Sequence, residues 1–202
     1  MDVLADISSV KSLAVSSFSG DFKDRQIGRA FPHACLTMLI ELGAGSTVVG
    51  GVQSRFAVAG LQDGPTTFEQ QGSIDCVEVR IAPSVALRLG FGLGDLMSTT
   101  VPADSLFGKT ANSLADRLAE TENNKRGVVV RDTFRPLLTA QRKTRTVEAV
   151  EQLERAGSRS QISGLVADFG GSRSSFWRTT RSALGMSAQH YLSSAQDPRE
   201  QP

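Results

Sequence analysis

The sequence is poor in the residues that metal and redox centres require. It contains only two cysteines, Cys35 and Cys76, and two histidines, His33 and His190, among 202 residues. The cysteines stand in separate apolar runs without CxxC spacing, so we interpret them as small buried side chains in a reducing cytosol. The histidines are far apart and lack converging carboxylates, which predicts no metal site and no cofactor. We expect His33 to be structural and His190 to be partly exposed.

Long apolar runs and catalytic signatures are also missing. No segment approaches the ~20 apolar residues of a membrane span, and residues 1–13 carry acidic residues where a signal peptide is basic. We therefore expect a cytoplasmic protein without a membrane partner. Gly90 opens the segment GFGLGDL, but no Lys-Ser/Thr follows, so we interpret these glycines as a helix terminus rather than a phosphate loop. Because no GxSxG or local Cys/His signature occurs either, we expect no enzyme.

Charge is nearly balanced overall but is unevenly distributed. The net charge of +1 argues neither for nor against an anionic partner. From Thr139 onward there are nine Lys and Arg against six Asp and Glu, whereas residues 1–138 hold 13 against 15. The positive charge is therefore modestly concentrated in the C-terminal third, where a nucleic-acid contact would be sought.

The first part of the chain has the pattern of an antiparallel β structure. Segments rich in strand formers alternate with Gly, Pro and Asp at intervals of about 8–12 residues, which favours a sandwich or barrel. Residues 74–83 are the clearest strand, because apolar and polar side chains alternate at nearly period two. A turn is expected at residues 19–21. The expected strands are residues 12–18, 33–42, 47–49, 55–59, 66–69 and 74–83.

From Ser84 the pattern becomes helical. Helices are expected over residues 84–97 and 105–122, the second with an apolar stripe formed by Leu106, Leu114 and Leu118. These helices are expected to belong to the same domain as the strands, residues 1–138.

A basic segment, residues 139–145, marks the expected domain boundary. It is charged and lacks apolar periodicity, which is typical of a linker. Thr146 is then expected to cap a helix that ends at Ala156-Gly157. The buried face of this helix is predicted to consist of Val147, Val150 and Leu153. Residues 146–202 form the second expected domain.

The stretch from Gln161 to Leu184 predicts two short helices joined by a glycine turn. Apolar residues recur at helical spacing over residues 162–169, and glycines at 170–171 end that helix. Ser172 is placed to cap the second helix by accepting its free amide hydrogens. Phe176 is placed to pack back on the first helix. This order of helix, glycine turn and cationic helix is the pattern of a DNA-reading helix-turn-helix.

The second helix, residues 173–184, is the candidate DNA-recognition element. It carries arginines and no acidic residue, which favours contacts with phosphates and base edges over an ordinary solvated face. Trp177 stays open to two interpretations, packing on the core or contact with DNA or a partner. The predicted DNA-binding residues are Ser172, Arg173, Ser174, Ser175, Trp177, Arg178 and Arg181.

The order of these features resembles the AraC/XylS family of transcriptional regulators, of the actinobacterial sort, over nearly the whole chain. In the first part the resemblance is carried by residues 32–43 (PHACLTMLIELG), 59–66 (AGLQDGPT), 77–96 (VEVRIAPSVALRLGFGLGDL), 100–108 (TVPADSLFG) and 113–120 (SLADRLAE). In the last part the family pattern I-x-x-L-A, G-x-S and G-x-S-P is matched by Ile162, Leu165 and Val166, by Gly170 and Ser172, and by Gly185, Ser187 and Ala188.

The resemblance implies an α+β protein with two parts. A β-rich, barrel-like or sandwich-like sensor domain with appended helices would be followed by an all-α helix-turn-helix. The implied partners are double-stranded DNA and a small-molecule effector of unknown identity. Because the family has two helix-turn-helix units and the tail after Gly185 is too short for a second, a homodimer in which each protomer supplies one recognition helix is expected.

Three residues depart from the family pattern, and one of them, Thr180, favours an alternative together with the missing second unit, whereas the retained arginines oppose it. Val166 stands where a small Ala is usual, Thr180 where a large apolar residue is usual, and Ala188 where Pro is usual. Each change weakens the packing or termination of the unit. The alternative is therefore a regulator-derived interaction module with little or no DNA binding of its own, which pairs with a protein or small ligand through its β-rich domain.

Overall fold

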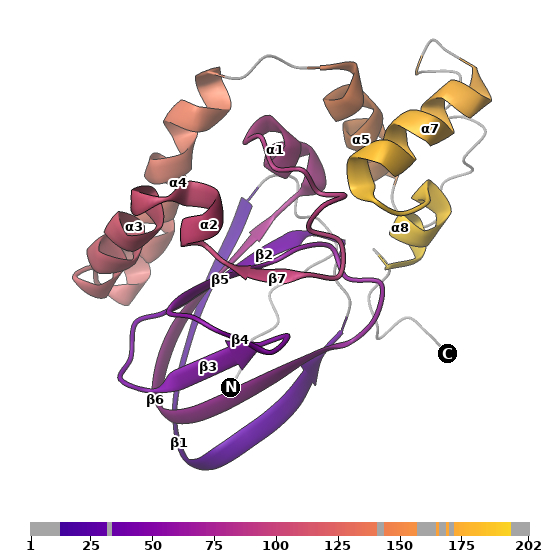
Figure 1. Cartoon of the computed structure of the whole chain (residues 1–202). Helices are drawn as coiled ribbons and strands as arrows, with labels where there is room; N and C mark the ends of the chain where they lie inside the picture. Colours follow the sequence, from indigo (N-terminus) through magenta and orange to yellow (C-terminus); the bar gives the residue numbers. More distant parts are fainter. Residues whose placement is uncertain are drawn as a thin grey trace.

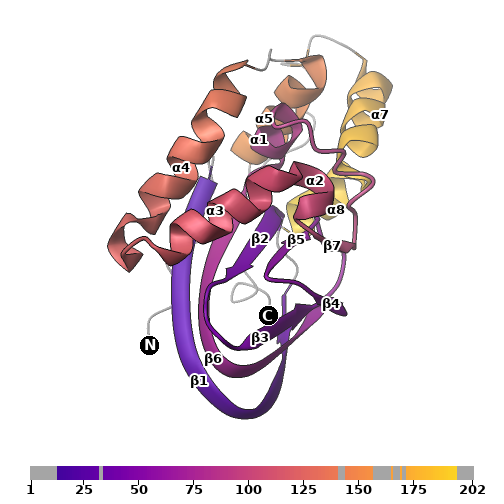
Figure 2. The same ribbon diagram turned by 60° about the vertical axis from the view of Figure 1, so that its left-hand side comes forward.

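The computed structural model describes residues 13–31, 34–140, 144–156, 165, 169 and 172–194. Outside these residues lie the predictions for His33, for residues 141–143 of the basic segment, and for Ile162, Val166, Gly170 and Gly171. The described residues form an α+β protein in which the helices gather at one end of a strongly curved sheet (Figure 1, Figure 2). The α+β class expected from the sequence is confirmed.

The described strands form one seven-stranded antiparallel sheet that curls into a nearly closed barrel (Figure 1). Their order is β4-β3-β6-β2-β5-β7, with β1 added on β6. The long β6 organises the sheet, because it pairs with β1, β2 and β3. The strands are β1 (Leu13–Ala30), β2 (Leu36–Glu41), β3 (Ser46–Val49), β4 (Val52–Gln53), β5 (Phe56–Ala59), β6 (Thr66–Ile81) and β7 (Thr100–Pro102).

The two longest strands differ from the sequence prediction. The turn expected at residues 19–21 is wrong, since these residues lie inside β1, opposite residues 73–75 of β6. The two strands expected over residues 66–83 are likewise one strand. The hydrogen bonds of the long β1–β6 pair outweigh the local turn signals, and the chain takes up the curvature at a bulge between Phe22 and Gln26. The sequence did not predict the short strands β4 and β7.

One face of the curved sheet packs against the helices. On β2, Leu36, Met38 and Ile40 are fully buried, and on β6 the same holds for Val79 and Ile81. These side chains share one face because alternate residues of a strand point to the same side, and they belong to one hydrophobic cluster with helical residues. The period-two prediction for residues 74–83 is thus confirmed.

Both cysteines lie outside this hydrophobic cluster, and Cys76 is on the face of β6 opposite to Val79 and Ile81. Cys35 and Cys76 are buried and free, as the sequence predicted. Burial raises the pKa of Cys35 to about 11 and also raises the pKa of Cys76. Both thiols are therefore protonated at neutral pH, and neither is a nucleophile or a ready metal ligand.

Helix α1 (Pro83–Arg88) ends well before residue 97, where the sequence pattern placed its end. Gly90 adopts a φ of +90° just beyond the helix. The amides of Gly90 and Phe91 donate to the carbonyl oxygens of Leu87 and Ala86, each at 3.0 Å. This pair of bonds is a Schellman motif, which requires a left-handed residue. The interpretation of the glycine segment as a helix terminus is confirmed.

Two helices, α2 (Asp104–Phe107) and α3 (Lys109–Ala119), replace the single helix expected over residues 105–122. Gly108 separates them with a φ of +54°. Leu114 and Leu118 are buried as expected, and α4 (Asn123–Ala140) packs against α3 and β1. In the part of the chain that the structure describes, no helix is long and apolar enough to cross a membrane.

The last three described helices are α5 (Arg145–Ala156), α7 (Arg173–Leu184) and α8 (Ala188–Ser194). The predicted buried face of α5 is confirmed, but its cap is Thr144 and not Thr146. Thr144 Oγ1 accepts a hydrogen bond from the Val147 amide at 3.2 Å, because the chain becomes helical at Arg145, two residues earlier than predicted. Helix α5 packs on both α1 and α7. The division of the chain at residues 139–145 stays a prediction.

Candidate nucleic-acid interface

Helix α7 begins and ends at residues that the sequence marks for these roles. Ser172 has an extended backbone, and its Oγ accepts a hydrogen bond from the Ser175 amide at 3.1 Å. Gly185 ends the helix with a left-handed φ of +75°. The predicted cap and the predicted bounds of the helix are confirmed.

The two faces of α7 differ in burial. Successive residues are rotated by about 100°, so Phe176, Thr180 and Ala183 share the inner face, and all three are buried. Arg178 and Arg181 lie on the opposite face and are exposed. Of the predicted DNA-binding residues, those exposed are Ser172, Arg173, Ser174, Arg178 and Arg181, whereas Ser175 and Trp177 are half-buried.

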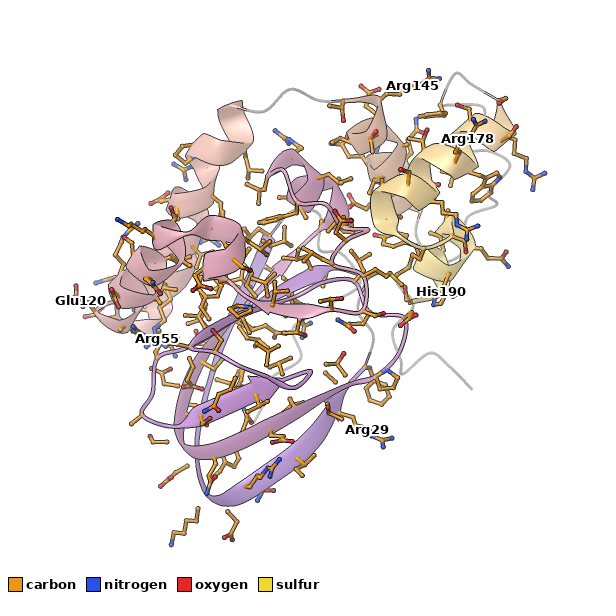
Figure 3. All side chains as sticks on the ribbon, in the orientation of Figure 1. Arg29, Arg55, Glu120, Arg145, Arg178 and His190 are labelled. Atoms are coloured by element: carbon orange, nitrogen blue, oxygen red, sulfur yellow. The ribbon has the colours of Figure 1, made fainter. Side chains whose placement is uncertain are left out.

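The exposed face of α7 is cationic without acidic neighbours in sequence. No Asp or Glu occurs from residue 169 to residue 196. Arg173, Arg178 and Arg181 form no ion pair with another described residue, in contrast to the arginines of α4 and α5 that pair with carboxylates along their own helices. An arginine without a carboxylate keeps its donors available for an anion. Figure 3 shows Arg178 at the outer surface of the helical layer, away from the barrel.

Trp177 lies at the border between the two faces. Its indole meets the Phe176 ring at a centroid distance of 5.6 Å, edge to face, and packs against the core cluster. The packing interpretation of Trp177 is therefore confirmed for the covered part of the ring. Its exposed part borders the face of α7 that carries Arg173, Arg178 and Arg181, which we call the arginine face.

Phe176 carries a chain of ring contacts toward α5. It is fully buried, as predicted, and lies 5.1 Å from the Phe169 ring, edge to face. The guanidinium carbon of Arg145 lies over the Phe169 ring, 4.7 Å from its centroid. Arg145 was assigned to the linker by the sequence pattern, but it is the first residue of α5.

The two described departures from the family pattern are accommodated. Thr180 is fully buried, and its hydroxyl meets the carbonyl oxygens of Phe176 at 3.0 Å and of Trp177 at 3.2 Å. The buried hydroxyl is thus satisfied within its own helix. Ala188 is also fully buried and begins α8.

A half-buried carboxylate joins α5 to α1. Glu154 accepts hydrogen bonds from the Ser84 amide at 2.7 Å and from the Ser84 hydroxyl at 2.5 Å. Ser84 lies in the first turn of α1, whose own cap residue supplies no side-chain bond, so Glu154 satisfies a free amide there. Burial raises the pKa of Glu154, and the bonds from Ser84 oppose this effect. Burial, and then the nearby charge of Glu154, raise the pKa of Tyr191 on α8.

The end of α7 packs directly against the segment that follows α1. A Cβ added at Gly185 would lie 3.0 Å from the Cα of Gly94 and 3.1 Å from the Cβ of Met97. Only glycine at this position allows the two backbones to approach so closely.

His190 is exposed on α8, as expected. Among the residues that the structure describes, no group of three or more His, Cys, Asp and Glu side chains is arranged to hold a metal ion. The candidate site is the arginine face of α7 with its surroundings, and exposed arginines are side chains suited to binding anions.

Sequence patterns did not identify Glu154, Gly94 and Arg145 as partners of this region. Glu154 directly follows the buried Leu153. A carboxylate at such a partly buried position usually has a hydrogen-bond or ion-pair partner. Nothing in the sequence identifies that partner as Ser84, 70 positions earlier.

This chain has only low similarity to known proteins. No family model and no curated protein matches the chain. Three solved structures are similar at low identity. ToxT from Vibrio cholerae O395 has a TM-score of 0.45 and 10% identity, over 92% of this chain and 79% of that chain. ToxT in a P21 crystal form has a TM-score of 0.46 and 9% identity, over 91% and 80%.

The third structure, ToxT bound to (E)-4-(8-methylnaphthalen-1-yl)but-3-enoic acid, has a TM-score of 0.42 and 10% identity, over 91% of this chain and 80% of that chain. Similarity this low supports no inference about the function of the present chain. The function depends on the chain's own residues and their geometry.

Proposed function

We propose that this protein is a DNA-binding transcriptional regulator that inserts α7 into the major groove. The observation that supports this most is the exposed arginine face of a well-capped helix, in a stretch of sequence without acidic residues. A helix of this kind fits the width of the major groove and presents donors to phosphates and to base edges.

The residues of α7 have distinct roles in this proposal. Ser172 fixes the start of the helix, and Arg173, Ser174 and Ser175 in the first turn approach the groove. Arg178 and Arg181 lie further along the exposed face and contact base edges or flanking phosphates. Trp177 supports the helix through its contact with Phe176 and borders the DNA with its exposed edge.

The remaining parts serve control and pairing. Residues 1–138 act as a sensor and dimerisation domain, which responds to a small-molecule effector, and residues 146–202 bind DNA after a linker at 139–145. In a homodimer the two α7 helices would meet two half-sites about one helical turn of DNA apart. A single α7 gives weak binding with strong salt dependence, because a few phosphate contacts dominate its affinity.

A gel-shift titration at low salt, with duplex DNA from the region upstream of the protein's own gene, tests the proposal. Replacing Arg178 with alanine should reduce affinity by about 1–3 kcal/mol if this residue contacts a base. Arg29→Ala is the matched control, since Arg29 is exposed on the barrel, away from α7 (Figure 3). If wild-type protein binds no duplex but still forms a dimer or binds a protein partner, the chain is an interaction module instead.

A further inference from the structure

We propose that Arg145 is a further DNA contact, which binds a backbone phosphate beside the groove occupied by α7 and is held in place by the Phe169 ring. The inference rests on the proposed function and extends it to a residue outside the recognition helix. It follows from the position of the guanidinium, the packing of the ring beneath it and the absence of an ion pair between Arg145 and any other described residue.

The guanidinium of Arg145 is held although it is exposed. Its central carbon lies 4.7 Å from the centroid of the Phe169 ring, within the range of a cation–π contact. A planar guanidinium stacked on a ring keeps its N–H groups directed outward, in the plane in which it binds phosphate. Such a side chain loses less freedom on binding an anion than a free one does.

The ring that holds Arg145 is fixed to the inner face of α7. Phe169 is only 9% exposed and meets the fully buried Phe176 edge to face at 5.1 Å. The position of Arg145 is thus tied through one aromatic ring to the helix that carries Arg178. Helices α5 and α7 also pack directly on each other, and Figure 3 shows Arg145 and Arg178 at the outer edge of the helical layer.

Apart from its contact with the Phe169 ring, the charge of Arg145 has no partner among the described residues. It stands at the first position of α5, where a cation is disfavoured by the helix dipole. Arg145 forms no ion pair with any described residue, whereas Arg155 at the other end of the same helix lies 3.9 Å from Glu151. An exposed cation that costs helix stability and lies over an aromatic ring fits the binding of an external anion.

Duplex DNA is the anion that fits best, because Arg145 accompanies an arginine face on α7 rather than standing alone. In a helix-turn-helix the recognition helix lies in the groove while neighbouring elements contact the backbone. Contacts of this kind position the protein without reading sequence. Loss of Arg145 should therefore weaken binding to all duplexes alike.

The test is the salt dependence of binding, measured for two duplexes of equal length, the gene's own upstream region and a random sequence. The slope of log K against log salt is negative. Arg145→Ala should reduce its magnitude by about 0.9, the value for one phosphate contact, on both duplexes. Arg145→Lys keeps the charge and should keep the slope while losing affinity. The control is Arg155→Ala, on the same helix, which should match wild type.

The role of Phe169 is tested with Phe169→Leu, after urea unfolding has verified that the variant folds. This variant should retain the full salt slope and lose affinity, and Arg145→Ala should have a smaller effect in its background than in wild type. Equal effects in the two backgrounds would remove Phe169 from the proposal.

Three outcomes overturn the inference and separate it from the proposed function. If Arg145→Ala matches wild type in slope and affinity while Arg178→Ala weakens binding, Arg145 is not a contact and the regulator proposal stands. If wild-type protein binds neither duplex at low salt, both proposals fail. If Arg145→Ala loses binding to poly-glutamate but not to DNA, the anion is an acidic protein surface.

Discussion

Glu154 links α5 to α1 through its hydrogen bonds with Ser84. Its carboxylate accepts two hydrogen bonds from Ser84 and closes the start of α1. Burial nevertheless raises its pKa above the ordinary value of 4.5. Desolvation disfavours the charged form of this half-buried carboxylate, whereas the hydrogen bonds favour it.

The stability of the protein should depend on pH through Glu154. A raised pKa in the folded state means that the protonated form favours folding, so this contribution is complete below the unfolded value and is lost as the pH rises through the folded value. Glu154→Gln cannot titrate. The free energy of unfolding of wild type minus that of Glu154→Gln should therefore fall as the pH rises from the ordinary value of 4.5 through the raised pKa of the folded state.

Urea unfolding of both proteins across this range measures the difference. The matched control is Glu148→Gln, which changes an exposed carboxylate on the same helix. A difference between wild type and Glu154→Gln that stays flat with pH, or that rises, would contradict the raised pKa.

At the scale of single elements, α7 is defined by its two ends. Its inner face is buried by tertiary packing, but its bounds are set by Ser172 and Gly185, which satisfy backbone groups that the helix leaves free. The arginines of the exposed face contribute little to the helix itself. Helix formation and anion binding are therefore carried by different residues, and each can be changed alone.

Ser172→Ala should reduce the free energy of unfolding by about 1 kcal/mol, because the Ser175 amide loses its partner. Denaturant unfolding gives the value, with Ser182→Ala as a control in the exposed last turn of the same helix. The change should also weaken DNA binding by fraying the first turn. A Ser172→Ala protein as stable as the control would show that the cap is not needed.

At the scale of the whole molecule, the C-terminal helices are closely fitted to the barrel part. One hydrophobic cluster includes β2, α1, α5, α7 and α8, and Gly185 lies against Gly94. The side chains of β2 and those that support α7 therefore belong to one core. A change at this contact affects the position of α7 without touching its arginines.

Gly185→Ala should destabilise the protein by more than about 1 kcal/mol, because a φ of +75° is costly for alanine and its Cβ would press on Gly94. Thermal or urea unfolding measures the loss. Gly64→Ala is the control, since a Cβ there meets no atom within 4 Å. Equal stability of the two variants would mean that the α7 end relaxes away from the barrel part.

The sequence by itself determined the features that depend on near neighbours. The period-two pattern of β6, the buried face of α5, the left-handed Gly90 and the cap at Ser172 follow from residues within one or two turns of each other. The predicted DNA-binding residues were also found by a local pattern. Their exposure is now known for the arginines, and their contact with DNA stays a prediction.

Only the tertiary structure decided the features that join distant segments. The β1–β6 pair carries the chain straight through the expected turn at residues 19–21, because each paired residue of β1 has its partner on a strand 36 to 68 positions away. The same is true of Glu154 with Ser84 and of Gly185 with Gly94. A local pattern fixes which face of an element is apolar, but the partner that covers this face is fixed only when the whole core packs.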